Sequence, residues 1–166
     1  NMLDQFPGMV AVVSDSYDIF NAVSKIWGEE LLSKVMNHEG TLVIRPDSGD
    51  PRLVIPAVLH TLGEKFGFVL NEKGFKVLPD KVRVIQGDGI SYETMSGIID
   101  EILHTGWSLN NIAFGSGGGL LQMVNRDTLR FACKASAIQI DGKWQDVYKN
   151  PVTDTRKVSK RGRLAL

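Results

Sequence analysis

The sequence predicts an α/β fold in which parallel strands alternate with helices, followed by a β-rich C-terminal segment. Two observations predict it. Short apolar, β-branched runs recur along residues 1–130, each followed by a glycine- or aspartate-rich turn and a stretch with helical spacing. From residue 131 onward, short strand-like runs surround an Asp-Gly turn. Alternating units build parallel sheets with right-handed crossovers, and four such strands could form a small open sheet or part of a barrel. Because Asn1 is not a start methionine and the last residues stop as though an element were beginning, we expect the first segment to be part of an α/β barrel.

The first two strand–helix units begin at buried apolar runs. Residues 9–13 predict a strand, and the polar residues 14–16 favour the start of a helix. Residues 41–44 predict the second strand, which is followed by a polar loop, 45–50, and a helix with Pro56 in its first turn. The apolar positions of these helices are Ile19, Phe20, Val23, Ile26 and Trp27 in the first, and Leu59, Leu62 and Phe66 in the second.

Two further units follow the same pattern. Residues 82–85 predict a third strand, which ends at the turn 86–89 before a helix capped by Ser91. Residues 112–114 predict a fourth strand, which runs into the glycine-rich loop 115–119. The helix expected after that loop carries Leu120, Leu121, Val124 and Leu129 on its apolar face.

Two β-hairpins are expected outside this repeat. Residues 67–81 contain a turn signal between two apolar stretches and predict a small hairpin before the third strand. Residues 131–148 predict a second hairpin around Asp141-Gly142. We therefore expect a partial barrel over residues 1–130, and over 131–166 a β-rich segment with a basic tail that begins an accessory domain.

The chain reads as an interior piece of a longer protein. Asn1 is not a start methionine, and the chain stops at Leu166 as though another element were beginning. A single cysteine, Cys133, excludes an intrachain disulfide and fits a reducing compartment; its apolar neighbours predict a buried, inert thiol. Neither a membrane span nor a signal peptide is recognisable, so we expect a cytoplasmic protein.

The overall charge gives no support to nucleic-acid or anionic-membrane partners. Lys+Arg and Asp+Glu both number 19, so the formal net charge is zero. Basic residues nevertheless crowd the last stretch, which fits either a solvated tail or phosphate binding within a larger protein. These residues are Arg156, Lys157, Lys160, Arg161 and Arg163.

Charged and glycine residues gather in the loops that follow the four strands. Asp15 lies after the first strand, Arg45 and Asp47 after the second, and Asp88 after the third, while the fourth is followed by Ser116 among glycines. In parallel α/β folds these loops share one face, and that face holds the active site. Taken alone, an aspartate in such a turn is often only a helix cap, and a glycine there often only a turn residue with positive φ.

Together these loops predict a site for a sugar phosphate with Mg²⁺. Converging carboxylates need a cation or a polyol to hold, and Mg²⁺ shares carboxylate ligands with substrate phosphates. The backbone N–H groups of the glycine run can bind a phosphate, and the positive N-terminal end of the next helix can add to that binding. Neither a P-loop nor a dinucleotide fingerprint is present. His38, His60 and His104 lie away from the strand ends, so a histidine metal site or catalytic triad is not expected.

The sequence of these loops resembles that of the nicotinamide phosphoribosyltransferases, and the resemblance extends over essentially the whole chain. The related nicotinate enzymes share the Asp-Ser-Gly element but resemble the later glycine loops less well. The segments that carry the resemblance are residues 14–19 (SDSYDI), 44–49 (IRPDSG), 84–89 (VIQGDG) and 113–122 (AFGSGGGLLQ), with additional matches at 27–29 and 160–164.

The resemblance implies a dimeric type II phosphoribosyltransferase with an irregular, TIM-like α/β barrel. Such an enzyme joins nicotinamide to 5-phosphoribosyl 1-pyrophosphate, giving nicotinamide mononucleotide and pyrophosphate, with Mg²⁺ and optional coupling to ATP hydrolysis. The active site would lie at the subunit interface. The family's base-stacking aromatic residues, its amide-selecting aspartate and its phosphorylated histidine would precede residue 1, so we expect these 166 residues alone to be inactive.

The resemblance also implies a role for individual residues. The catalytic residues would be Asp47, Arg45 and Asp15, with Asp15 and Asp47 near Mg²⁺ directly or through the substrate pyrophosphate. Gly87 and Asp88 would hold the ribose hydroxyls. Gly117 and Gly118 would bind the 5-phosphate, and the basic residues that meet pyrophosphate or nucleotide phosphates would be Arg126, Lys134, Lys149 and Arg163.

Two alternatives remain open from the residues. The first is a nicotinate-type phosphoribosyltransferase on the same barrel, and the second is a non-catalytic phosphate-binding or protein-interaction module. Nucleic-acid binding by the basic tail is a weaker third, which would require an affinity that falls steeply with salt.

Overall fold

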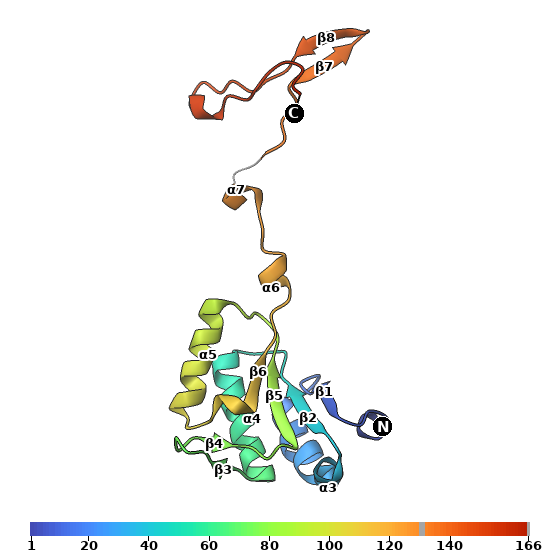
Figure 1. Ribbon diagram of the computed structural model, residues 1–166, viewed down its shortest axis with the longest axis vertical. Helices are drawn as coiled ribbons and strands as arrows, with labels where there is room; N and C mark the ends of the chain where they lie inside the picture. The colour runs from blue at the N-terminus through green and yellow to red at the C-terminus, as the bar shows by residue number, and fades with distance from the viewer. Residues whose placement is uncertain (130–131, 166) are drawn as a thin grey trace. The chain divides into compact units, whose positions relative to one another are not determined.

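The computed structural model describes residues 1–129 and 132–165, which form two compact units (Figure 1). The first unit spans Asn1–Met123 and the second Val124–Leu166. The sequence placed its division between residues 130 and 131, both of which lie outside the described residues. That the second unit begins an accessory domain stays a prediction.

A four-stranded parallel sheet forms the centre of the first unit. Its strands are β1 (Met9–Val13), β2 (Thr41–Arg45), β5 (Val82–Gln86) and β6 (Ile112–Phe114), and they lie in the order β1-β2-β5-β6. All three pairings are parallel, with Val12 opposite Ile44, Ile44 opposite Val84, and Val84 opposite Ile112. The predicted α/β class with alternating strands and helices is confirmed. Within the described residues the sheet is open and no closed barrel is formed.

Helices connect the strands, and local side-chain caps fix where several of them begin. The helical segments of this unit are α1 (Met2–Gln5), α2 (Ile19–Asn21), η1 (Ala22–Glu30, a π-helix), α3 (Leu32–Asn37), α4 (Pro51–Phe66), α5 (Tyr92–His104) and η2 (Leu109–Asn111, a 3₁₀ turn). Asp18 caps α2, Asp50 caps α4, and Ser91 caps α5 through a reciprocal capping box with Thr94. The predicted cap at Ser91 is confirmed.

The prediction that Pro56 lies in the first turn of its helix is wrong. Helix α4 already begins at Pro51, where the missing N–H and the fixed φ of proline suit the first position, and Asp50 accepts a hydrogen bond from Arg52 N at 3.0 Å. Pro56 therefore lies inside the helix, where it is buried and removes one backbone hydrogen bond.

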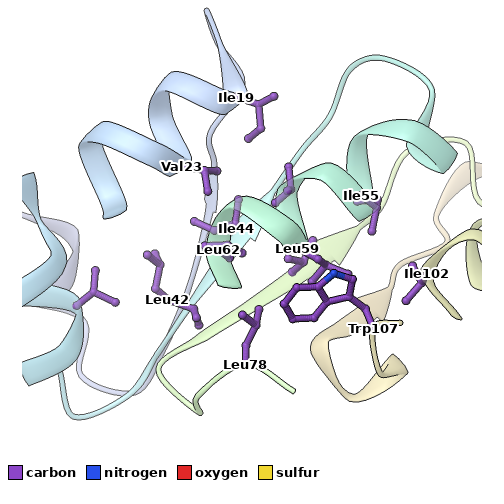
Figure 2. Packing of buried hydrophobic residues seen from close by; sticks show 14 of the residues in the cluster. Ile19, Val23, Leu42, Ile44, Ile55, Leu59, Leu62, Leu78, Ile102 and Trp107 are labelled. Atoms are coloured by element: carbon purple, nitrogen blue, oxygen red, sulfur yellow. The ribbon is translucent and has the colours of Figure 1, made fainter. Parts of the chain in front are cut away.

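The hydrophobic core lies on one face of the sheet. Alternate residues such as Leu42 and Ile44 pack with Leu59 of α4 and with Trp107 (Figure 2). The opposite face carries Met9, which is 75% exposed within the described chain. Helices therefore cover one face of this sheet, and the apolar side chains of edge strand β1 on the other face remain open.

The predicted hairpin before the third strand is confirmed. Strands β3 (Val69–Leu70) and β4 (Lys76–Val77) pair antiparallel. The Asn71 carboxamide oxygen accepts hydrogen bonds from Lys73 N and Phe75 N, both at 3.0 Å, and so closes the turn.

The long helix expected after the glycine-rich loop is not formed. Only two single turns are present, α6 (Gly118–Leu121) and α7 (Arg126–Leu129), and Val124 between them is exposed. Glycines weaken a helix start, and Asn125 caps a separate turn by accepting from Asp127 N and Thr128 N. The helical spacing of the apolar residues therefore does not predict the structure of residues 118–129.

The second unit contains the predicted hairpin at Asp141-Gly142. Strands β7 (Ala137–Ile140) and β8 (Lys143–Asp146) pair antiparallel, and the two turn residues have φ angles of 49° and 76°. A short 3₁₀ turn, η3 (Thr155–Lys157), follows. The prediction of a buried Cys133 is wrong, because its thiol is exposed in an irregular stretch before β7.

Candidate active site

The loops that follow β1, β2, β5 and β6 lie at the carboxyl edge of the sheet, next to one another. Strand order repeats chain order, so each loop neighbours the loop of the next strand–helix unit. Seven of the predicted site residues lie in these loops or at the ends of the strands that precede them: Asp15, Arg45, Asp47, Gly87, Asp88, Gly117 and Gly118.

Asp15 joins the first loop to the second. Its Oδ2 accepts a hydrogen bond from Asp47 N at 2.8 Å and another from the Ser48 hydroxyl. The Ser48 hydrogen bond is the main cause that lowers the pKa of the Asp15 carboxyl, so this half-buried group stays ionised at neutral pH. Asp15 is not a helix cap, because Asp18 accepts from Phe20 N and Asn21 N instead.

Arg45 and Asp47 form an ion pair within the second loop. The Arg45 guanidinium donates to Asp47 Oδ1 from Nε at 3.2 Å and from Nη2 at 2.9 Å. The two side chains are 42% and 46% exposed, so the pair adds little to stability and is open to a ligand. Among the described residues, no hydrogen bond engages Asp15 Oδ1 or Asp47 Oδ2. Each carboxylate therefore keeps one oxygen for another group.

The third loop lies against Arg45. A Cβ added at Gly87 would meet the Arg45 guanidinium at 3.7 Å, an ordinary contact distance. The expected positive φ occurs at Gly89, at 63°, and not at Gly87. The buried Gln86 side chain donates to Asp88 O at 3.0 Å, which fixes the turn and leaves the Asp88 side chain exposed.

The glycine-rich loop is tied to the third loop by two hydrogen bonds. Gly115 N donates to Gln86 O at 2.9 Å, and Ser116 Oγ donates to Ile90 O at 3.0 Å. Gly117 and Gly118 are exposed. Because α6 is a single turn, the expected contribution of a helix dipole to phosphate binding is not supported, and the backbone N–H groups of the loop remain as donors.

The four predicted basic residues belong to the second unit. Arg126 pairs with Asp127 at 3.3 Å, and Lys134 is exposed. Lys149 is linked through its backbone to Ser159, and the Arg163 guanidinium lies 4.9 Å from the centroid of the Trp144 ring. This distance is within the range of a cation–π contact between the guanidinium and the indole ring.

The histidines lie away from this edge, as predicted. His38 is buried before β2, where its Nε2 donates to Gly8 O at 2.9 Å, and His60 and His104 lie on α4 and α5. Over the ranges 1–129 and 132–165, no group of three or more His, Cys, Asp or Glu side chains could hold a metal ion.

Within the same ranges, no helix combines the length and apolar character needed to cross a membrane.

Two polar side chains in this region were not recognised as functional from the sequence. From the sequence, Trp27 is an apolar helix position and part of the matching segment 27–29. In the structure its indole Nε1 donates to Ser14 Oγ at 3.2 Å, and Ser14 Oγ donates to Val12 O at 3.1 Å. Ser48 counted only as part of a motif. The π-helical turn η1 carries Trp27, and such turns occur frequently at functional sites.

A double-mutant cycle on Trp27 and Ser14 tests the first of these contacts. In the full-length protein, Trp27→Phe and Ser14→Ala should each lower the free energy of unfolding, and the double variant should lose less than their sum. The coupling energy expected for one neutral hydrogen bond is about 0.5–1.5 kcal/mol. It is measured by denaturant unfolding, and additive losses would mean that the contact contributes nothing.

Comparison with known proteins shows which family this chain resembles. The sequence model of the nicotinate phosphoribosyltransferase (NAPRTase) family matches residues 1–165. A nicotinamide phosphoribosyltransferase of Xanthomonas campestris pv. campestris is 54% identical over 169 residues, covering 100% of this chain and 36% of the relative. A protein of the same name from Mycoplasma pneumoniae is 36% identical, and the match covers 98% of this chain and 39% of the relative. Another from Acinetobacter baylyi is 33% identical, and that match covers 95% of this chain and 35% of the relative.

The chain therefore spans a little over a third of the length of these relatives. The family match, by contrast, extends over nearly every residue. On that match, the chain belongs to the nicotinate phosphoribosyltransferase family.

Proposed function

We propose that the full-length protein transfers the phosphoribosyl group of 5-phosphoribosyl 1-pyrophosphate to nicotinamide, giving nicotinamide mononucleotide and pyrophosphate. The observation that carries the proposal is the linked set of four loops, in which Asp15 and Asp47 each keep one carboxylate oxygen unengaged. The names of the relatives point to nicotinamide as the base.

In this reaction the bond between the anomeric carbon and pyrophosphate breaks, and the ring nitrogen of nicotinamide bonds to that carbon. Positive charge builds on the ribose and negative charge on the departing pyrophosphate. Asp88 would hold the ribose hydroxyls with Gly87, and Arg45 would lie near the base and the ribose. Fixed charges of this kind act strongly where charge develops, so no nucleophilic side chain is needed.

Phosphate recognition would fall to backbone and basic groups. Gly117 and Gly118 would bind the 5-phosphate through backbone N–H groups, since neither residue has a side chain that would hinder the approach. The basic residues of the second unit would meet pyrophosphate or nucleotide phosphates; they are Arg126, Lys134, Lys149 and Arg163.

The proposal includes Mg²⁺ at Asp15 and Asp47. Their unengaged oxygens suit this ion, which usually binds one or two carboxylates together with substrate phosphates. Bound there, Mg²⁺ would neutralise charge on the pyrophosphate. Asp47 N and the Ser48 hydroxyl would hold the Asp15 carboxylate in place. From the resemblance we also propose a cytoplasmic homodimer with its active site at the subunit interface, and optional coupling to ATP hydrolysis.

The test is an assay of the full-length protein with phosphoribosyl pyrophosphate, Mg²⁺ and either nicotinamide or nicotinic acid, with the mononucleotides separated by chromatography. We expect nicotinamide to give the higher kcat/KM by at least about tenfold, a difference of roughly 1.4 kcal/mol in transition-state binding. A preference for nicotinic acid would instead identify the nicotinate-type transferase that the family name describes. Binding of phosphoribosyl pyrophosphate without turnover of either base would identify a non-catalytic phosphate-binding module.

A further inference from the structure

Asp15 and Asp47 come from different loops, and Ser48 is the side chain that links them. Its hydroxyl donates to Asp15 Oδ2, the same oxygen that accepts from Asp47 N at 2.8 Å. One carboxylate oxygen therefore receives two hydrogen bonds from two consecutive residues of the neighbouring loop. Two donors on Oδ2 restrain the rotation of the Asp15 carboxylate about the Cβ–Cγ bond more tightly than one donor would.

The loop that carries Ser48 is itself held at both ends. Before it, Arg45 pairs with Asp47 Oδ1 at 2.9 Å, and Ser14 N donates to Arg45 O at 3.1 Å. After it, Gly49 adopts a φ of 87°, and Asp50 caps α4. The restrained backbone gives the Ser48 Cβ a defined direction, and the hydrogen bond to Asp15 Oδ2 then orients the hydroxyl.

We propose that Ser48 is a positioning residue for the reaction, which sets the separation and orientation of the Asp15 and Asp47 carboxylates. Ser48 itself does not touch the reacting atoms. It acts through Asp15, whose remaining oxygen is then presented at a fixed place beside Asp47. This inference rests on the proposed function, because the group that the two carboxylates would share is the pyrophosphate side of phosphoribosyl pyrophosphate.

A positioning role predicts an effect that is selective for one substrate. Asp15 and Asp47 are assigned to the pyrophosphate and metal region, so loss of the Ser48 hydroxyl should affect phosphoribosyl pyrophosphate far more than nicotinamide. A general loosening of the fold would instead weaken both substrates and lower the melting temperature.

The experiment compares full-length wild type with Ser48→Ala, Ser48→Thr and the control Ser24→Ala. Ser24 also donates its hydroxyl, to Phe20 O at 2.6 Å, but it is a half-buried residue of η1 outside the site. We measure kcat and KM for each substrate, the Kd of phosphoribosyl pyrophosphate with Mg²⁺ by calorimetry, and Tm.

Ser48→Ala should lower kcat/KM for phosphoribosyl pyrophosphate about 10–100-fold, the usual cost of losing a residue that orients a ligand-binding side chain. Its KM for nicotinamide and its Tm should stay close to wild type. Ser48→Thr keeps the hydroxyl and should recover most of the loss, while Ser24→Ala should match wild type.

Three results would overturn the inference. The first is a Ser48→Ala variant whose parameters for phosphoribosyl pyrophosphate stay within twofold of wild type. The second is an equal loss for both substrates together with a lowered Tm. The third is a threonine variant as impaired as the alanine variant. Failure of the proposed function is distinguished by the wild type itself, which would then neither bind phosphoribosyl pyrophosphate nor turn it over, and the inference would fall with it.

Discussion

Replacement of Asp47 by asparagine in the full-length protein should lower the turnover of nicotinamide and phosphoribosyl pyrophosphate by about 100-fold or more, the usual cost of removing one group that stabilises transition-state charge. The substitution removes a negative charge at nearly constant shape. Arg45, which donates to Asp47 Oδ1 at 2.9 and 3.2 Å, then faces a neutral amide, and one of the two unengaged carboxylate oxygens is lost. Steady-state production of nicotinamide mononucleotide measures the effect.

The matched control is Asp80→Asn. Asp80 also pairs with an arginine, Arg83, at 2.6 Å, but it lies just before β5, at the opposite edge of the sheet. This variant should keep wild-type turnover, because the Asp80 side chain is 98% exposed and an ion pair made by an exposed carboxylate contributes little. Turnover of Asp47→Asn within twofold of wild type would remove Asp47 from the mechanism.

Gly40→Ala should produce the largest loss of stability. A Cβ at Gly40 would overlap the carbonyl oxygen of Gly8, and that oxygen cannot move aside, because it accepts from Thr41 N at 3.1 Å and from His38 Nε2 at 2.9 Å. The added methyl group must therefore separate the starts of β1 and β2. We expect a cost of about 3 kcal/mol or more, at the upper end for overpacking.

The change appears in the full-length protein as a lowered Tm, or as loss of soluble protein. Glu39→Ala is the control, since Glu39 is the exposed neighbour of Gly40. If Gly40→Ala melted with the wild type, the close approach of these two segments would be refuted.

The parallel sheet could be predicted because its strands have a strong local signal. Residues such as Val43, Ile44 and Val84 lie in short apolar runs that end in turn residues, and burial in a parallel sheet demands that composition. The cap at Ser91 acts within three residues of its own position. Local chemistry decides both features, so one sequence is sufficient to find them.

Elements set by competition between neighbouring signals could not be predicted. Pro56 reads as a helix start, but Pro51 together with Asp50 is the stronger start five residues earlier. The stretch after Gly119 has helical spacing, yet Asn125 begins a new turn. Cys133 has apolar neighbours in sequence, but the exposure of its thiol depends on tertiary packing, which periodicity does not report.

For the candidate site, too, the sequence predicts some features and not others. That Asp15, Asp47 and Asp88 share one edge follows from parallel topology alone, so the sequence predicts it. The contacts that hold them do not follow. Nothing in the pattern shows that Asp15 accepts from Ser48 rather than capping a helix, or that Trp27 donates to Ser14, because these partners are 33 and 13 residues apart.

The order of the strands has a consequence for synthesis. Because β1, β2, β5 and β6 are neighbours in the order in which the ribosome produces them, each new strand can dock on the edge left by the strand before it. Asp15 can then meet Ser48 while β6 is still untranslated, and the tie between Ser116 and Ile90 closes last. The emerging chain would acquire its carboxylate pair before its glycine-rich loop, and an arrest of translation after residue 100 should leave the first contact intact.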